Sequence, residues 1–230
     1  MEPKAPDPVL GAKLLNDIPG RVEAAARHFR QGCARERRVP DWREFQIQWF
    51  IKYIGLYSTD LGQTYGDRRA DSLAQAMRNL LELRVWVRYC ALSDEDAKRF
   101  FDDGIRDLRE IMETFQKVYT RANKEPQKRI DDILAEMKTK APAFNVNDYE
   151  SGYLRVNDAA AKIGEQQEHS AFYKIASKFA HPTAVLLAMQ DPGARGMLDS
   201  LFEVGAKLAD SALRDMEGIV QGIYPDLDAV

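Results

Sequence analysis

The sequence predicts an all-α fold, a single helical-bundle-like domain of about seven or eight helices. Apolar residues recur at three- and four-residue spacing along most of the 230 residues, whereas the alternation typical of strands is nearly absent. The segments between these stretches are short, which fits one bundle. The chain contains no Walker-type loop, no GxGxxG and no GxSxG motif, so nothing indicates a dinucleotide-binding or hydrolase fold.

The N-terminal part is expected to hold a tail and then helix. Residues 1–8 contain three prolines and no apolar periodicity, which predicts a flexible tail ahead of a domain at 9–230. Val9–Asp17 is expected to form a short first turn. Pro19 suits the start of a longer helix, because the first N–H groups of a helix are unpaired. We expect this helix to end near Arg38.

Caps and breakers delimit the remaining helices. Asp41 followed by Glu44 resembles a capping box, and Gly62 and Gly66 are expected to interrupt the chain. Ser93 is a hydroxyl cap followed by three acids, which the helix dipole favours. The expected helices lie near residues 41–61, 67–92, 93–122, 126–140, from 157, 165–181 and 194–224. Residues 141–155 are predicted to form the main loop.

Charge and cysteine content restrict the class of protein. The net charge is −3, but Arg21–Arg38 carries six arginines and Asp191–Val230 carries eight acids. We expect these two ends to face each other within the fold or across a dimer, and at most weak binding of RNA or DNA. Two cysteines without CxxC spacing argue against disulfides and a zinc site. With no signal pattern and no long apolar run, we expect a cytoplasmic protein without membrane contact.

The predicted helix at 67–92 is apolar on most sides, which is typical of a helix at the centre of a domain. Arg78, Glu82 and Tyr89 nevertheless form a narrow polar stripe along it. Because buried charges need partners, this stripe predicts either a structural network or a functional site. Arg84 and Arg88 form a second stripe, which we expect to face solvent.

The helix expected at 165–181 also carries a polar stripe. One face is apolar and should contact the core, with Phe172, Ile175, Ala176 and Phe179. Four polar side chains follow one turn apart along its edge: His169, Tyr173, Ser177 and His181. We expect the stripe at Arg78 and Glu82 to contact this one, because each then supplies partners for the other.

His181 has two readings. It precedes Pro182, so it can cap the last carbonyls of a helix, or it can serve a functional site. His169 and His181 are separated by about 18 Å of helix, too far to share an ion. We therefore expect no metal and no cofactor.

The segments Arg78-Asn79-Leu80-Leu81-Glu82 and Tyr173-Lys174-Ile175-Ala176-Ser177-Lys178-Phe179-Ala180-His181-Pro182-Thr183 resemble a pattern of uncharacterised bacterial all-helical proteins. Those proteins resemble HEPN domains, which occur in toxin–antitoxin, antiphage and RNA-processing systems. The resemblance covers about residues 67–190. It implies a metal-independent RNase with an Arg-x(4–6)-His motif, but no arginine precedes His181 at that spacing. This departure favours the non-catalytic branch of the family.

Three hypotheses follow. The first is a non-catalytic helical binding or interaction module of a bacterial cytoplasmic system related to stress or defence, with an unknown protein partner or a second copy. The second is an endoribonuclease in which His181 acts as general acid or base, Arg78 holds the phosphate and Glu82 orients Arg78. The third is a purely structural dimer.

Overall fold

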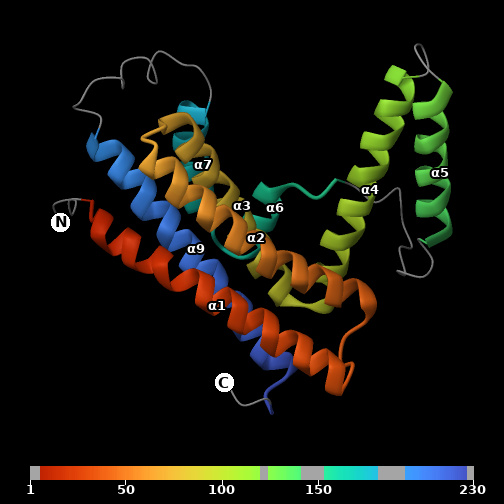
Figure 1. Cartoon of the computed structure of the whole chain (residues 1–230), viewed down its shortest axis with the longest axis horizontal. Helices are drawn as coiled ribbons and strands as arrows, with labels where there is room; N and C mark the ends of the chain where they lie inside the picture. Colours follow the sequence, from red (N-terminus) through yellow and green to blue (C-terminus); the bar gives the residue numbers. More distant parts are fainter. Residues whose placement is uncertain (1–5, 120–123, 141–152, 181–194, 227–230) are drawn as a thin grey trace.

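Eight α-helices make up most of the residues that the computed structural model describes, which are 6–119, 124–140, 153–180 and 195–226 (Figure 1). This confirms the all-α prediction. Residues 1–5 of the expected tail, most of the expected loop at 141–155 and the expected turn at 191–193 lie outside these ranges. The helices are α1 (Pro8–Arg35), α2 (Asp41–Gly66), α3 (Ala70–Leu92), α4 (Asp94–Tyr119), α5 (Lys124–Lys140), α6 (Val156–Lys162), α7 (Gln166–Ala180) and α9 (Arg195–Ile223).

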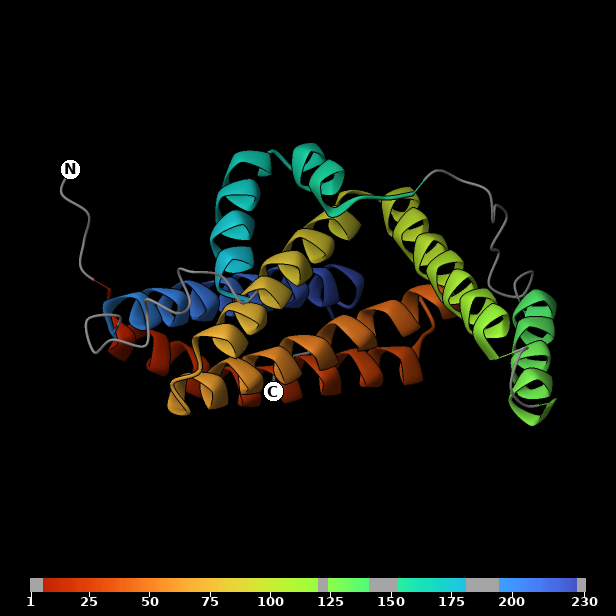
Figure 2. The same cartoon turned by 90° about the horizontal axis from the view of Figure 1, so that it is seen from above.

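Helix α3 occupies the centre, as its apolar distribution predicts. It packs against α2, α4, α6, α7 and α9, and Figure 2 shows it running between α7 and the layer of α1, α2 and α9. Leu73, Leu80 and Val87 are fully buried. Burial on several sides explains why α3 lacks a single polar face, and its few charges must therefore find partners inside the fold.

Helices α1 and α9 lie side by side and bring the basic and acidic ends of the chain together, which confirms that prediction (Figure 1). Arg21 donates to Asp210 over 2.7 Å and to Glu217 over 2.6 Å, and these contacts raise the pKa of Arg21. Arg38 pairs with Asp226 just beyond α9. The arginines of this segment are therefore partly neutralised within the fold.

Two expected boundaries in the N-terminal half are wrong. Pro19 lies inside α1, which begins at Pro8 with the Asp7 carboxylate accepting from the Leu10 N–H over 3.0 Å. The helix continues through Pro19, whose ring is exposed, while its neighbour Ile18 is buried. Gly62 lies inside α2, and the side chain of Asp41 makes no cap at the start of that helix. Tertiary packing outweighs these local signals.

The capped start of α4 is confirmed, and a polar cluster fixes it to the body. The Ser93 hydroxyl accepts from the Asp96 N–H over 3.1 Å. Buried Arg43 donates to the Cys90 carbonyl in the last turn of α3 over 2.8 Å, and Gln46 donates to the Ala97 carbonyl over 2.8 Å. From this base α4 leads away from the bundle with α5 beside it, and we call this pair the arm (Figures 1 and 2). No described helix is both long and apolar enough to span a bilayer.

Close packing of α1 on α9 generates a first prediction. A Cβ at Gly32 would lie 2.5 Å from ring carbons of Tyr224, whereas one at Gly20 of the same helix meets no atom within 4 Å. We expect Gly32→Ala to lower the free energy of unfolding in urea by about 1–3 kcal/mol through overpacking. Gly20→Ala is the control and should raise it by about 0.5–1 kcal/mol. Equal effects of the two substitutions would contradict the α1–α9 contact.

Candidate functional site

The junction between α6 and α7 places an acidic side chain against α3. Gly164 ends α6 with a φ of +77°, a left-handed conformation that glycine adopts without strain. The backbone N–H of the next residue, Glu165, donates to the Ala160 carbonyl over 2.8 Å, and its backbone carbonyl accepts from the His169 N–H over 2.9 Å. Glu165 therefore stands at the N-terminus of α7, where the helix dipole favours its negative charge.

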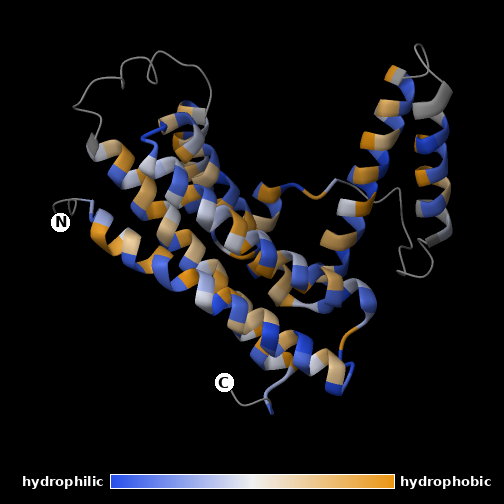
Figure 3. Cartoon of the chain, viewed as in Figure 1, coloured by the Kyte–Doolittle hydropathy of each residue, from blue (hydrophilic) through white to orange (hydrophobic). Residues whose placement is uncertain are grey.

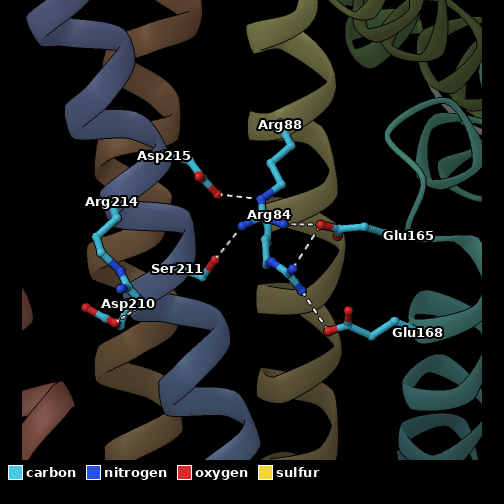
Figure 4. Close-up of polar contacts among 8 residues, drawn as sticks. All are labelled: Arg84, Arg88, Glu165, Glu168, Asp210, Ser211, Arg214 and Asp215. Carbon is cyan, nitrogen blue, oxygen red and sulfur yellow. Dashed lines mark hydrogen bonds and ion pairs between the residues drawn. The ribbon is translucent and has the colours of Figure 1, made fainter.

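Glu165 contacts two arginines of α3 at once (Figure 4). Its Oε1 accepts from Arg84 Nη2 over 3.0 Å and also from Arg88 Nη1. The side chains of Arg84 and Glu165 are only 9% and 15% exposed. Charges at this depth require the pairing that the structure shows, because either group alone would remain desolvated without a counter-ion.

The same arginines extend the network to other helices. Arg84 Nη1 donates to Glu168 of α7 over 3.0 Å. Arg88 donates to Asp215 over 2.6 Å and to Ser211 over 3.0 Å, both in α9. Burial opposes the charge of Arg88, but Asp215 and Glu165 outweigh it and raise the pKa of Arg88. Figure 4 shows α3 between α9 on one side and α7 on the other, joined by these side chains.

The expectation that Arg84 and Arg88 face solvent is wrong. Arg84 is buried and Arg88 is half-buried, each with carboxylate partners. Two cations one turn apart on a central helix require acids elsewhere, and Glu165 and Glu168 supply them at a spacing of three. Each pair spans about one helical turn, but this spacing alone does not identify which acids lie near the arginines.

Arg78 joins α3 to α7 further along the helix. Its Nε donates to Glu82 over 3.0 Å, and its Nη2 donates to the Tyr173 hydroxyl over 2.5 Å. The guanidinium carbon also lies 4.3 Å from the centroid of the Tyr173 ring, a cation–π distance. The side chains of Arg78 and Glu82 are 24% and 31% exposed, so this cluster sits at the rim of the core.

His169 lies deeper than the sequence indicates. It is 4% exposed, and neither ring nitrogen has a hydrogen-bond partner in the described part of the chain. Its ring centroid is 5.6 Å from that of Tyr173. Burial lowers the pKa of His169, with Glu82 raising it and Arg78 lowering it. The buried face of α7 includes His169, whereas Ile175, expected in the core, is 42% exposed.

The other expected members of the network lie elsewhere. Tyr89 is buried near α6, with Lys162 5.5 Å from its ring centroid and Trp86 in edge contact. Ser177 is half-buried on α7, and no side-chain hydrogen bond joins it to the described residues. His181 lies outside the described residues. The structure thus brings together Arg78, Glu82, Tyr173 and His169.

Three further kinds of group bear on the chemistry of the site: possible metal ligands, thiols and the arginines of α3. Among the residues that the structure describes, no group of three or more His, Cys, Asp or Glu side chains could hold a metal ion. Cys33 and Cys90 are free thiols, and burial raises the pKa of Cys90, which keeps that thiol protonated and unreactive. The three arginines of α3 are all bound to acids of the chain itself.

A groove between α1 and α2 has no counterpart in the sequence-based candidates. It encloses about 620 Å³ and is lined by Pro19, Val22, Glu23, Ala26, Phe29, Arg30, Phe45, Gln48, Trp49, Ile51, Lys52, Gly55 and Thr59. Phe45 and Trp49 are 49% and 47% exposed. They begin a row of aromatic rings at a spacing of four along α2, which continues through Tyr53 and Tyr57 with neighbouring centroids 5.1–5.4 Å apart. The groove thus has aromatic side chains open to solvent, and Glu23, Arg30 and Lys52 also line it.

Comparison with known proteins gives one match. The model of a family of unknown function, DUF5677, matches residues 66–192, more than half of the chain. No curated protein and no solved structure matches the chain. The matched segment contains α3 to α7, and with them Arg78, Arg84, Arg88 and Glu165, whereas α1, most of α2 and α9 lie outside it.

The ion network generates a second prediction. Glu165→Gln should lower the free energy of unfolding by about 3 kcal/mol, because Arg84 and Arg88 lose the carboxylate that they share. Asp71→Asn is the matched control, because Asp71 pairs with Arg69 at the surface, where such a pair contributes at most about 1 kcal/mol. Urea unfolding at neutral pH measures both. A Glu165→Gln variant as stable as the wild type would show that the network is not required.

Buried His169 generates a third prediction. Its pKa in the folded state lies below the ordinary 6.5, so the unfolded chain takes up a proton that the folded chain resists. The contribution of His169 is therefore fully present above pH 6.5 and is lost as the pH falls below it. His169→Phe should reduce the loss of unfolding free energy between pH 7 and pH 5, measured by urea unfolding. An unchanged pH dependence would mean that His169 ionises freely in the folded protein.

Proposed function

The chain belongs to DUF5677, a family of unknown function, and we propose that it is a non-catalytic helical interaction module. One observation carries the proposal. The three arginines of α3, Arg78, Arg84 and Arg88, are bound to acids of the chain, while an aromatic groove outside the family segment is open. The family segment thus supplies a rigid framework, and recognition takes place at the groove.

Internal pairing of the arginines argues against a nuclease centre on α3. A phosphate-binding arginine presents its planar donors to the ligand. Arg84 and Arg88 instead present theirs to Glu165 and to acids of α7 and α9, and Arg78 presents its donors to Glu82 and Tyr173. A phosphate would have to displace these carboxylates, some of them in a nearly dry environment, which is costly.

The groove has the composition of a protein-binding surface. Aromatic residues are enriched at interfaces, where they bury a large area and lose few rotamers. Phe45 and Trp49 present such area beside Val22 and Ala26. Arg30 and Lys52 lie at the same groove and have no ion-pair partner among the described residues, so they remain available to an acidic ligand.

The proposal includes a bacterial cytoplasmic setting. The two cysteines are free thiols, the state that reducing compartments maintain. A link with stress or defence rests on the resemblance to HEPN domains and on nothing in the geometry. The nuclease hypothesis needs His181 near a free Arg78, and Arg78 is engaged by two partners.

An RNA-cleavage assay distinguishes the proposed interaction module from the alternative hypothesis of a nuclease. Purified protein incubated with labelled single-stranded RNA at physiological salt should leave the RNA intact on a denaturing gel. Anisotropy of the same RNA should show at most weak binding, because the basic helix α1 is partly neutralised by α9. His181→Ala and Arg78→Ala variants are the controls. RNA cut by the wild-type protein and spared by both variants would refute the proposed function.

A further inference from the structure

The arm carries a stripe of exposed apolar residues on α4. Leu108, Ile111 and Val118 of α4 are 41%, 49% and 62% exposed, and their spacing of three and seven residues places them on one side of the helix. Apolar residues recur along α4 in Figure 3. Helix α4 also contacts α5, where Gln116 donates to Asp131 over 2.6 Å. Leu108, Ile111 and Val118 nevertheless keep a large part of their apolar surface exposed.

Negative charge flanks this stripe. Asp107 and Glu110 precede Leu108 and Ile111, and their side chains are 44% and 60% exposed. Both lie near Arg106, at 3.4 and 3.9 Å, but Arg106 also pairs with Asp103. One guanidinium thus faces three carboxylates, so the flank of the stripe keeps a net negative charge that an external cation can neutralise.

The groove between α1 and α2 offers the complementary charge. Arg30 and Lys52 are exposed at its walls, and neither has an ion pair in the described parts of the chain. Glu23 also lines the groove, with Arg27 at 3.8 Å from it. The groove therefore combines apolar and aromatic walls with two available cations, the counterpart of an apolar helix with an acidic flank.

The two surfaces also agree in length. The lining of the groove extends from Pro19 to Arg30 on α1 and from Phe45 to Thr59 on α2, about 16–21 Å at the rise of a helix. The segment from Asp107 to Val118 is about 16 Å long by the same measure. One face of α4 therefore fits along the groove as a helix laid into a hydrophobic cleft.

Within one chain the two surfaces are separated. Figures 1 and 2 show the arm leading away from the layer of α1, α2 and α9. Arg43 and Gln46 of α2 fix only the base of the arm, through the Cys90 carbonyl at the end of α3 and the Ala97 carbonyl at the start of α4. A second copy brings the two surfaces together, because a two-fold axis places each arm at the groove of the other copy and repeats the contact.

We propose that two copies of the chain associate by reciprocal docking, in which the stripe on α4 of each copy lies in the α1–α2 groove of the other. Asp107 and Glu110 of one copy then pair with Arg30 and Lys52 of its partner, and the stripe covers Trp49. This inference rests on the proposed function, because it identifies the groove as the binding surface and names the ligand of that surface.

Charge reversal tests the docking by sedimentation velocity at micromolar concentration and physiological salt. The wild type should sediment at twice the chain mass of 26.2 kDa. Arg30→Glu/Lys52→Glu and Asp107→Lys/Glu110→Lys should each weaken association more than tenfold. An equimolar mixture of the two variants should restore the dimer, because both contacts of the mixed dimer again join opposite charges. Lys13→Glu/Lys174→Glu, reversed outside both surfaces, should remain dimeric.

Ile111→Glu provides a second, apolar test on an exposed residue, and it should abolish the dimer with an unchanged helical circular dichroism spectrum. A monomeric wild type would overturn the inference. So would a dimer that survives the groove variant, since it would use another surface. These outcomes are distinct from failure of the proposed function, which is read from RNA cleavage by the same preparations.

Discussion

The contact of one carboxylate, Glu165, with Arg84 and Arg88 is the constraint on which the arrangement of α3, α7 and α9 depends. A buried ion pair adds little net stability compared with apolar packing, but an unpaired member costs several kcal/mol. The network therefore adds little to the free energy of unfolding, but it favours one arrangement of the three helices over the alternatives. Any other rotation of α3 would leave charges desolvated without partners, whereas the observed one satisfies Arg84 from α7 and Arg88 from both neighbours.

The buried ion network and the exposed apolar residues of α2 and the arm lie in different parts of the chain. Arg84, Arg88 and Glu165 of the family segment face inward, where they join α3 to α7 and α9. Exposed apolar residues include Phe45 and Trp49 of α2 and Leu108, Ile111 and Val118 of the arm. The exposed apolar surface supports the proposed role in protein contact, since large exposed apolar patches are typical of interaction sites.

His169 and Ile175 show how far the helix pattern of a sequence can mislead. By polarity alone, the sequence of α7 predicts that Ile175 lies in the core and His169 at the edge of the apolar face. The structure does the reverse, because α7 packs on a helix that is itself apolar on several sides and thus accepts more than one face. Isoleucine tolerates partial exposure, whereas a neutral imidazole tolerates burial with a depressed pKa.

The sequence by itself determined the helical class, the central position of α3 and the capped start of α4, because periodicity and caps are local properties. It left open whether the basic and acidic ends meet within the fold or across a dimer, and the structure shows that they meet within the fold. The sequence also indicated that Arg78 and Glu82 need partners. Only the tertiary structure decided which acids pair with Arg84 and Arg88, that α1 passes through Pro19, and that α1 and α2 form a groove. These features depend on which helices become neighbours, and neighbours are chosen by the packing of the whole chain rather than by any one segment.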